Sequence, residues 1–313
     1  MKKPLDIIFM GTPAFAVPHL EALATAGHRV LAVVTQPDRP VGRGRQLTPP
    51  PVKRSAQRLG IPVLQPKKIR TEGFAREMAA LAPDVLVVVA FGRILPAALL
   101  DLPRLGAVNI HGSLLPRYRG PAPIQWALIN GDAVTGVTAM LMDEGLDTGP
   151  TLCAREVAIL PEDTSATLHD RLAVAGAEVL IAALEGLASG SLTPVAQDDR
   201  QATYAPLLAK KDGRIAWQKS ARELTCFIRG MTPWPGAYTF HGQRRLKIFR
   251  AQPLALATGE TPGRVLAGFE DELRVATGDG VLSILEIQGE SGKRHAIRDF
   301  LRGHPLPPGT LLA

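Results

Sequence analysis

The stretch that decides the fold reads Val108-Asn109-Ile110-His111-Gly112-Ser113-Leu114-Leu115-Pro116-Arg117-Tyr118-Arg119-Gly120. In a β-strand, residues i and i+2 point to the same face, so Asn109 and His111 would project together from the end of a short apolar strand. Gly112 then ends the strand, and a polar loop begins. Open α/β sheets bind ligands beyond the carboxyl ends of their strands, so this stretch predicts both such a sheet and a ligand site at its edge.

The segments before this stretch alternate between strands and helices. Residues 7–10 and 30–35 predict two strands joined by a helix, and residues 84–90 form an unbroken apolar run, typical of a central parallel strand covered on both faces. The order predicts an α/β fold with a doubly wound, mainly parallel sheet. Only Gly11 lies at the first turn, where a dinucleotide fingerprint needs three glycines, so the sequence argues against a nicotinamide cofactor.

The composition bounds the class of protein. The chain has 313 residues, which suggests two domains, and its 46% apolar and 21% charged residues are ordinary for a soluble globular protein. No run reaches the roughly 20 apolar residues of a membrane span, and residues 7–10 resemble a first strand more than a signal peptide. The only cysteines, Cys153 and Cys226, form neither a disulfide framework nor a zinc pattern, which suits a reducing cytoplasm.

The pattern changes beyond a polar linker at residues 190–206. Short strand candidates separated by turns recur at 237–240, 245–250, 263–267, 273–277 and 281–287, with helices expected at 220–230 and 295–303. Closely spaced short strands are the signature of a small β-barrel, here of the OB-like kind. We therefore expect an α/β domain over residues 1–189, the linker, and a basic β-barrel domain over residues 207–313.

Charge separates the two parts of the chain. Residues 1–207 hold 20 Lys and Arg against 19 Asp and Glu, whereas residues 208–313 hold 16 against 10. The basic second part predicts contact with a polyanion such as nucleic acid, with a surface that only serves solubility as the alternative. Residues 36–54 add a long loop with five basic residues and one acidic residue, which we interpret as a basic arm that closes on nucleic acid rather than an idle surface loop.

Three loops at the ligand edge, 91–96, 109–120 and 143–150, bring together an amide, an imidazole and a carboxylate on Asn109, His111 and Asp147. One His and one Asp make a poor metal site. Ser113 lacks the Gly-x-Ser-x-Gly elbow of a nucleophilic serine. A third interpretation, which we favour, is acyl transfer without a covalent intermediate, in which the amide and imidazole stabilise an oxyanion and the carboxylate handles a proton. The alternative to all three is that Asn109 and His111 are satisfied polar groups at a strand end.

At these residues the chain resembles a known family. Residues 109–120 look like the signature of the 10-formyltetrahydrofolate-dependent formyltransferases, and residues 143–150 are similar to the same family. Residues 35–44 and 233–239 are similar to the branch whose acceptor is methionyl-initiator tRNA. The resemblance covers essentially the whole chain. It implies the doubly wound formyltransferase fold, with Asn109, His111 and Asp147 as catalytic residues.

The resemblance also implies the reaction and the residues that bind each substrate. The chain would transfer the formyl group of 10-formyltetrahydrofolate to the α-amine of methionyl-initiator tRNA for translation initiation, in the cytoplasm, as a monomer, without a metal or a membrane. The expected folate-binding residues are Phe91, Gly92, Ile94, Leu95, Ser113, Leu114, Leu115, Pro116, Asp143 and Gly145. The expected tRNA-binding residues are Arg39, Arg43, Arg45, Lys210, Lys211, Arg244, Arg245 and Lys247.

Two other functions compete. A hydrolase of 10-formyltetrahydrofolate or a sugar-amine formyltransferase would present water or a different amine to the same site, and the basic arm and C-terminal part argue against both. A folate-dependent or RNA-binding regulatory protein without turnover is the rival of a different class, and the complete set of Asn109, His111 and Asp147 argues against it.

Overall fold

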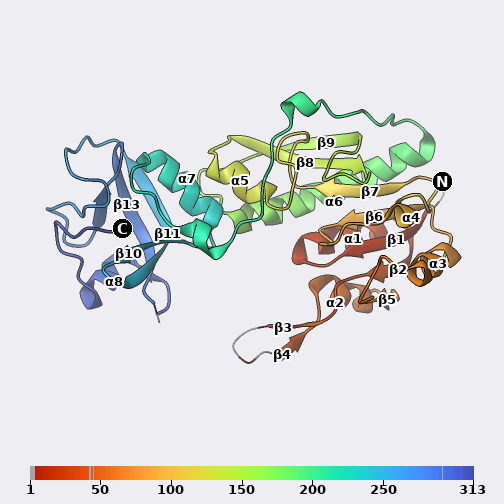
Figure 1. Cartoon of the computed structure of the whole chain (residues 1–313), viewed down its shortest axis with the longest axis horizontal. Coiled ribbons are helices and arrows are strands. Elements are labelled where there is room, and N and C mark those ends of the chain that lie inside the picture. The colour runs from red at the N-terminus through yellow and green to blue at the C-terminus, as the bar shows by residue number, and fades with distance from the viewer. Residues whose placement is uncertain (1–3, 42–43, 45, 291) are drawn as a thin grey trace. The chain divides into compact units, whose positions relative to one another are not determined.

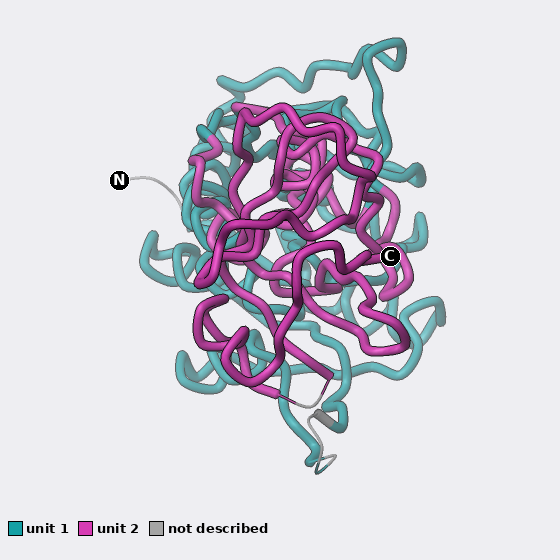
Figure 2. The backbone as a smooth tube through the Cα atoms, turned by 90° about the vertical axis from the view of Figure 1, so that its left-hand side faces the viewer, with its two compact units in different colours: residues 1–120, 134–158, 169–205 teal, residues 121–133, 159–168, 206–313 magenta. Residues whose placement is uncertain are grey.

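The protein is described by a computed structural model (Figure 1) that covers residues 4–41, 44, 46–290 and 292–313. It forms two compact units, coloured separately in Figure 2. Unit 1 comprises residues 1–120, 134–158 and 169–205, and unit 2 comprises residues 121–133, 159–168 and 206–313. Two short segments, residues 121–133 and 159–168, thus pack with residues 206–313. The expected domains at residues 1–189 and 207–313, joined by a linker at 190–206, stay a prediction.

Unit 1 is built on a seven-stranded sheet in the order β5-β2-β1-β6-β7-β8-β9. The first five strands pair in parallel, whereas β8 pairs antiparallel with both of its neighbours, β7 and β9. The doubly wound, mainly parallel sheet is therefore confirmed, and the strand candidate at 151–159 is indeed an antiparallel edge. The strands are β1 (Asp6–Gly11), β2 (Arg29–Val34), β5 (Val63–Leu64), β6 (Val85–Val89), β7 (Ala107–His111), β8 (Val134–Leu141) and β9 (Thr151–Ala158).

Helices cover both faces of this sheet. They are η1 (Ala14–Ala16), α1 (Val17–Thr25), α2 (Pro51–Arg58), α3 (Glu72–Ala80), α4 (Ala97–Leu100) and α6 (Ser165–Ser189), with a short η2 (Asp199–Gln201). On one face, Leu86 and Val88 of β6 pack in a cluster with Phe74 of α3 and Leu99 of α4. Every residue of β6 is buried, as expected for a central strand whose alternating side chains meet helices on both sides.

A close approach of α6 supports β7 from the opposite face. A Cβ atom at Gly176 would lie 2.5 Å from Nε2 of His19 and 3.1 Å from Cγ2 of Ile110, so glycine is required there. His19 is fully buried, and its Nδ1 donates a hydrogen bond to the carbonyl oxygen of Phe15 at 2.9 Å. Burial lowers the pKa of His19 to about 4, so this imidazole is neutral in the folded protein at pH 7.

Helix α6 is also long and apolar enough to cross a membrane, by length and composition alone. More than half of its most apolar window is buried inside the protein. Leu172, Leu180 and Leu184 have no appreciable exposure, and the backbone carbonyl of Val179 lies 3.7 Å from Sγ of Cys153 on β9. Within the described residues α6 is thus a core helix packed on the sheet, and its apolar character comes from that packing.

The basic arm contains more regular structure than the sequence predicts. Strands β3 (Arg39–Val41) and β4 (Gln46–Thr48) pair as an antiparallel hairpin, and α2 begins at Pro51. The prediction of one long loop over residues 36–54 is therefore wrong. Three consecutive prolines suggested irregular chain, but Pro51 occupies the first helical turn, where its missing N–H costs no hydrogen bond.

Unit 2 is a five-stranded antiparallel sheet, in the order β10-β11-β13-β12 with β14 beside β13, packed on α7. The small OB-like fold is confirmed as a curled half-barrel. The candidate strand at 263–267 is wrong as a full strand, because these residues make only isolated bridges to Leu311 and Val275. The elements are β10 (Ala237–His241), β11 (Arg244–Leu254), β12 (Leu273–Ala276), β13 (Val281–Gln288), β14 (His295–Ala296), α5 (Pro123–Ile129), η3 (Lys210–Gly213), α7 (Ala221–Met231) and α8 (Ile297–Gly303).

Helix α7 begins where its sequence predicts. Ser220 accepts a hydrogen bond from the backbone N–H of Glu223, and Glu223 accepts one from the N–H of Ser220. This capping box satisfies two backbone donors that a helix start otherwise leaves free. Leu224 and Ile228 then fall on one face of the helix and are fully buried in the core of unit 2.

Candidate active site and nucleic-acid surface

Asn109 and His111 lie at the carboxyl end of β7 and project to the same face of the sheet, as their spacing predicts. Their exposed fractions are 9% and 7%. Among the residues that the structure describes, the Asn109 side-chain amide has no hydrogen-bond partner. A nearly buried amide with free donors can therefore bind a substrate oxygen without first breaking a protein contact.

The imidazole of His111 is oriented by the loop that follows its strand. Its Nε2 lies 2.8 Å from the carbonyl oxygen of Tyr118, and because a carbonyl only accepts, Nε2 carries a proton. The other nitrogen, Nδ1, lies 3.6 Å from Oδ2 of Asp147. Nδ1 is therefore the ring atom that faces the carboxylate and remains available for chemistry.

Asp147 comes from the loop between β8 and β9 and adopts an unusual backbone conformation. Its φ of 55° lies in the left-handed region, which non-glycine residues seldom occupy. Its carboxylate oxygen Oδ2 accepts a hydrogen bond of 2.8 Å from the backbone N–H of Gly120. The same loop needs glycine at position 149, because a Cβ there would collide with the carbonyl of Leu141.

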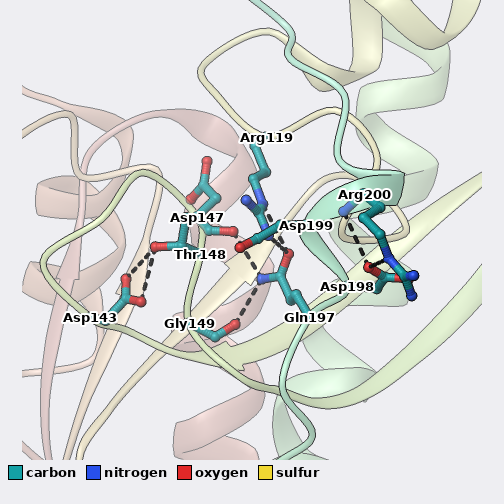
Figure 3. A network of polar contacts seen from close by, with 9 residues as sticks. All are labelled: Arg119, Asp143, Asp147, Thr148, Gly149, Gln197, Asp198, Asp199 and Arg200. Carbon is teal, nitrogen blue, oxygen red and sulfur yellow. Dashed lines mark hydrogen bonds and ion pairs between the residues drawn. The ribbon is translucent and has the colours of Figure 1, made fainter.

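Asp143 shapes the start of that loop. Its carboxylate accepts a hydrogen bond from the backbone N–H of Gly145 at 3.0 Å. It also accepts one from the hydroxyl of Thr148 at 2.8 Å (Figure 3). Both oxygens face the turn, so the side chain acts on the loop itself. Gly145 is exposed, and a Cβ there would collide with the Thr148 hydroxyl.

Ser113 and Thr138 hold the loop at residues 112–120, which we call the signature loop. The Ser113 hydroxyl is fully buried and donates to the carbonyl oxygen of Arg117 at 2.5 Å. The Thr138 hydroxyl donates to the Ser113 carbonyl at 2.7 Å and accepts from the Leu115 N–H at 3.1 Å. Ser113 is therefore a structural residue of the loop and is not placed as a nucleophile. Leu114, Leu115 and Pro116 are half-buried beside it.

The loop at 91–96 splits the expected folate-binding residues into two groups. Phe91 and Leu95 are buried in a core cluster, with exposed fractions of 2% and 3%. Gly92 and Ile94 are exposed, the latter by 65%, and Gly92 has a φ of 76°. Within this group Gly92 and Ile94 are exposed, whereas the side chains of Phe91 and Leu95 anchor the loop to the core.

A face of the sheet in unit 2 combines cations with aromatic rings. In β10 and β11, Tyr238 pairs with Lys247 and Phe240 pairs with Arg245, so these four side chains share one face. The Arg245 guanidinium lies 5.5 Å from the centre of the Tyr238 ring. Both rings are partly exposed, and we call Tyr238, Phe240, Arg245 and Lys247 the β10–β11 face.

Further basic side chains lie near this face or elsewhere in the chain. Arg214 extends over the Phe240 ring at 5.9 Å, and the Tyr238 hydroxyl donates to the carbonyl of Lys211 at 3.3 Å. The remaining expected tRNA-binding side chains in the described residues are exposed, namely Lys210, Lys211 and Arg244 in unit 2 and Arg39 in unit 1. Arg43 and Arg45 lie outside the described residues.

Three residues at this surface were not predicted from the sequence, namely Tyr238, Phe240 and Arg214. The signal was present in the alternation of aromatic and small residues along 237–241, which places both rings on one side of a strand. The side chains that hold Asp147 and Tyr118 were not predicted either, because they come from residues 197–205, within the expected linker. In the described chain no group of three or more His, Cys, Asp or Glu side chains could hold a metal ion.

Comparison with known proteins places this fold and site in context. Residues 5–184 match the formyl transferase family, and residues 207–305 match the formyl transferase C-terminal domain. A Helicobacter canadensis N-formyltransferase, in complex with folinic acid and dTDP-3-aminofucose, superposes with a TM-score of 0.68 at 18% identity, over 94% of this chain and 100% of that one. HypX from Aquifex aeolicus, in complex with tetrahydrofolic acid, gives a TM-score of 0.63 at 18% identity over 96% of this chain and 47% of that one.

The fold and these matches define the class of protein as a two-domain formyl transferase. A methionyl-tRNA formyltransferase of Citrifermentans bemidjiense is 52% identical over 308 residues, which cover 98% of this chain and 96% of that protein. The chain belongs to the methionyl-tRNA formyltransferase family.

Proposed function

We propose that this chain transfers the formyl group of 10-formyltetrahydrofolate to the α-amine of methionine esterified to tRNA. The observation that carries the proposal is the convergence of Asn109, His111 and Asp147 at the end of β7, in a chain 52% identical to a methionyl-tRNA formyltransferase over nearly its full length. The folate is a co-substrate, and the reaction as proposed uses no metal or nicotinamide.

The chemistry assigns a task to each residue. The amine nitrogen attacks the formyl carbon, a new N–C bond forms, and the bond from carbon to N10 breaks. The attacking amine must lose a proton, and Asp147 accepts it directly or through water. The oxygen of the tetrahedral intermediate becomes negative, and Asn109 and the protonated Nδ1 of His111 donate hydrogen bonds to it. The leaving N10 takes up a proton, which His111 can supply.

The pairing of His111 with Asp147 supports this assignment. Nε2 already donates to Tyr118, so Nδ1 can donate to an oxyanion only when the ring is positively charged. Oδ2 of Asp147 lies 3.6 Å from Nδ1 in a site that is largely buried, so the two side chains can act on the same substrate group. One oxyanion donor of this kind is typically worth about 10²–10³ in kcat.

Folate binding is proposed at the three loops that surround this site. The carbonyl oxygen of Phe91 accepts from Gln36 Nε2 at 3.2 Å and from the Thr12 hydroxyl at 3.3 Å, which supports the loop at 91–96 from behind. The exposed Gly92 and Ile94 would then meet the pterin ring. The backbones at 113–116 and 143–145 complete the proposed site.

The tRNA is proposed to bind through the basic residues of unit 2 and the arm. Partly exposed aromatic rings among cations, as on the β10–β11 face, suit a nucleic acid because bases stack on rings while cations meet phosphates. Arg39 is exposed on the β3–β4 hairpin, and Arg43 remains a candidate for the acceptor end from family likeness. Selection of the initiator tRNA, a monomeric state and a cytoplasmic location are part of the proposal.

One assay tests the function and separates its rivals. The purified chain is incubated with 10-formyltetrahydrofolate and Met-tRNA, and the products are identified by mass. N-formylmethionine recovered from the tRNA ester supports the proposal. Free formate without that product would indicate the hydrolase, formylation of an added dTDP-amino sugar alone would indicate the sugar enzyme, and no product would indicate a binding protein.

A further inference from the structure

Gln197, in the segment after α6, has its side-chain amide fully engaged next to the active site. Its Nε2 donates to the backbone carbonyl of Asp147 at 2.9 Å and to that of Gly149 at 2.7 Å. Its Oε1 accepts from Nε of Arg119 at 3.0 Å and from the terminal NH2 of the same guanidinium at 2.9 Å. Figure 3 shows Gln197 between Arg119 and the loop that carries Asp147.

The backbone of Asp147 needs such support. A non-glycine residue at φ 55° is disfavoured by contacts of its own Cβ, and it persists only where surrounding bonds hold it. Gln197 holds the main-chain oxygen of Asp147, and the N–H of Gly120 holds its carboxylate. Arg119 and Gly120 are adjacent, so one dipeptide supports both the backbone and the side chain of Asp147.

Arg119 is held just as firmly. Its exposed fraction is 2%, although Asp199, whose carboxylate lies 2.7 Å from the guanidinium, has a side chain that is 82% exposed. The buried part of the guanidinium is therefore satisfied mainly by the neutral amide of Gln197. Because a buried cation is costly unless it is paired, the position of Arg119 relative to Gln197 is closely defined.

The same segment also positions His111. The N–H of Tyr118 donates to the hydroxyl of Thr203 at 2.8 Å, and the N–H of Arg119 donates to the carbonyl of Thr203 at 2.8 Å. The carbonyl of Arg119 accepts from the N–H of Ala205 at 2.8 Å. These bonds fix Tyr118, whose φ is 61° and whose carbonyl accepts the Nε2 proton of His111.

From these contacts we infer that Gln197 is a positioning residue for Asp147 and that Thr203, through Tyr118, is a positioning residue for His111. Its amide fixes the position of the Asp147 backbone, and thereby the distance between the Asp147 carboxylate and Nδ1 of His111. The inference rests on the proposed function, because it takes Asp147 and His111 as the catalytic pair.

The decisive variant is Gln197→Glu. A glutamate keeps acceptor oxygens for Arg119 and so keeps the buried cation paired, but it removes both donors to the carbonyls of Asp147 and Gly149. We expect kcat to fall at least tenfold, with KM for both substrates within threefold and with the melting temperature preserved. Gln197→Ala, which loses the Arg119 contact as well, should lower kcat at least as much and also lower the melting temperature.

The split between kcat and KM separates positioning from a merely structural role. A structural loss lowers the melting temperature, whereas a displaced Asp147 lowers kcat while KM and the melting temperature are preserved. The matched control is Gln201→Ala, in the same segment, whose amide donates to the exposed turn at Asp198. It should leave kcat and both KM values unchanged.

Each outcome bears on one claim. Wild-type protein that makes no formylmethionine contradicts the proposed function. Wild-type protein that makes it, together with Gln197→Glu that keeps kcat within twofold or only raises KM, overturns the positioning role. A loss of kcat that matches a loss of folded protein in Gln197→Glu would also overturn it.

Discussion

Oδ2 of Asp147 lies 3.6 Å from Nδ1 of His111, and the two residues are separated along the chain by helix α5 and strand β8. Each is held from the other side by one backbone group, the N–H of Gly120 for Asp147 and the carbonyl of Tyr118 for His111. Both supports belong to the signature loop 112–120. A carboxylate and an imidazole from distant parts of the chain are thereby brought into one site by the residues between them.

Replacing His111 by alanine should remove an oxyanion donor without disturbing the folate loops. We expect kcat to fall by about 10²–10³ while the Kd for 10-formyltetrahydrofolate changes less than threefold. Steady-state kinetics and a direct binding titration measure the two quantities. An equal loss of affinity and turnover would show that His111 serves binding instead.

Asp147→Asn tests the charge of the carboxylate with little change in shape. Asparagine tolerates the left-handed backbone and keeps an oxygen for the N–H of Gly120, but it cannot accept the amine proton. We expect kcat to fall at least 10²-fold. Glu144→Gln, an exposed acid of the same loop, is the control. Turnover of Asp147→Asn near the wild-type value would remove Asp147 from the proton transfer.

The β10–β11 face should control use of tRNA and not of folate. Arg245→Ala and Lys247→Ala should each raise KM for Met-tRNA and reduce the slope of log K against log salt by about one unit. Tyr238→Ala should weaken tRNA binding by about 1–3 kcal/mol if a base stacks there. Arg302→Ala, an exposed cation on α8, is the control. If the affinity of the wild type for Met-tRNA did not change with salt, a role of the basic surface in tRNA binding would be contradicted.

His19 predicts a loss of stability in acid. Its folded pKa is about 4 against an ordinary 6.5, so between these values the unfolded chain binds a proton that the folded chain does not. The contribution of neutral His19 to the free energy of unfolding is fully present above pH 6.5. It falls as the pH drops towards 4, by about 3 kcal/mol in all. Denaturant unfolding at pH 7 and pH 4.5 measures it.

The control for that experiment removes the titrating group. In His19→Asn the free energy of unfolding should depend less on pH over this range, whereas His295→Asn, at an exposed position of β14, should behave as wild type. An identical pH dependence in wild type and His19→Asn would show that another group governs acid unfolding.

Much of the fold was predictable because its central elements are locally encoded. The apolar run 85–89 forms a buried central strand, and the spacing of Asn109 and His111 places both on one face. Thr71 and Ser220 stand at helix starts where their side chains cap. In each case a short sequence pattern suffices to define the structure.

The remainder depends on long-range contacts that no local pattern records. Gln197 meets Asp147 across 50 residues and Arg119 across 78, so a polar segment that reads as a linker is bound tightly to the site. The hairpin at residues 39–48 was hidden by its prolines and glycines. The burial of the Phe91 and Leu95 side chains was not predicted either, because hydrophobic side chains in a loop can anchor it to the core.

The most direct test follows a labelled formyl carbon from 10-formyltetrahydrofolate in a single turnover with Met-tRNA. In the wild type, the label should appear on the methionine amine. In Asn109→Ala/His111→Ala, which lacks both proposed oxyanion donors, the rate should fall by at least about 10². Label recovered only as formate, or transfer by the double variant at the wild-type rate, would contradict the account.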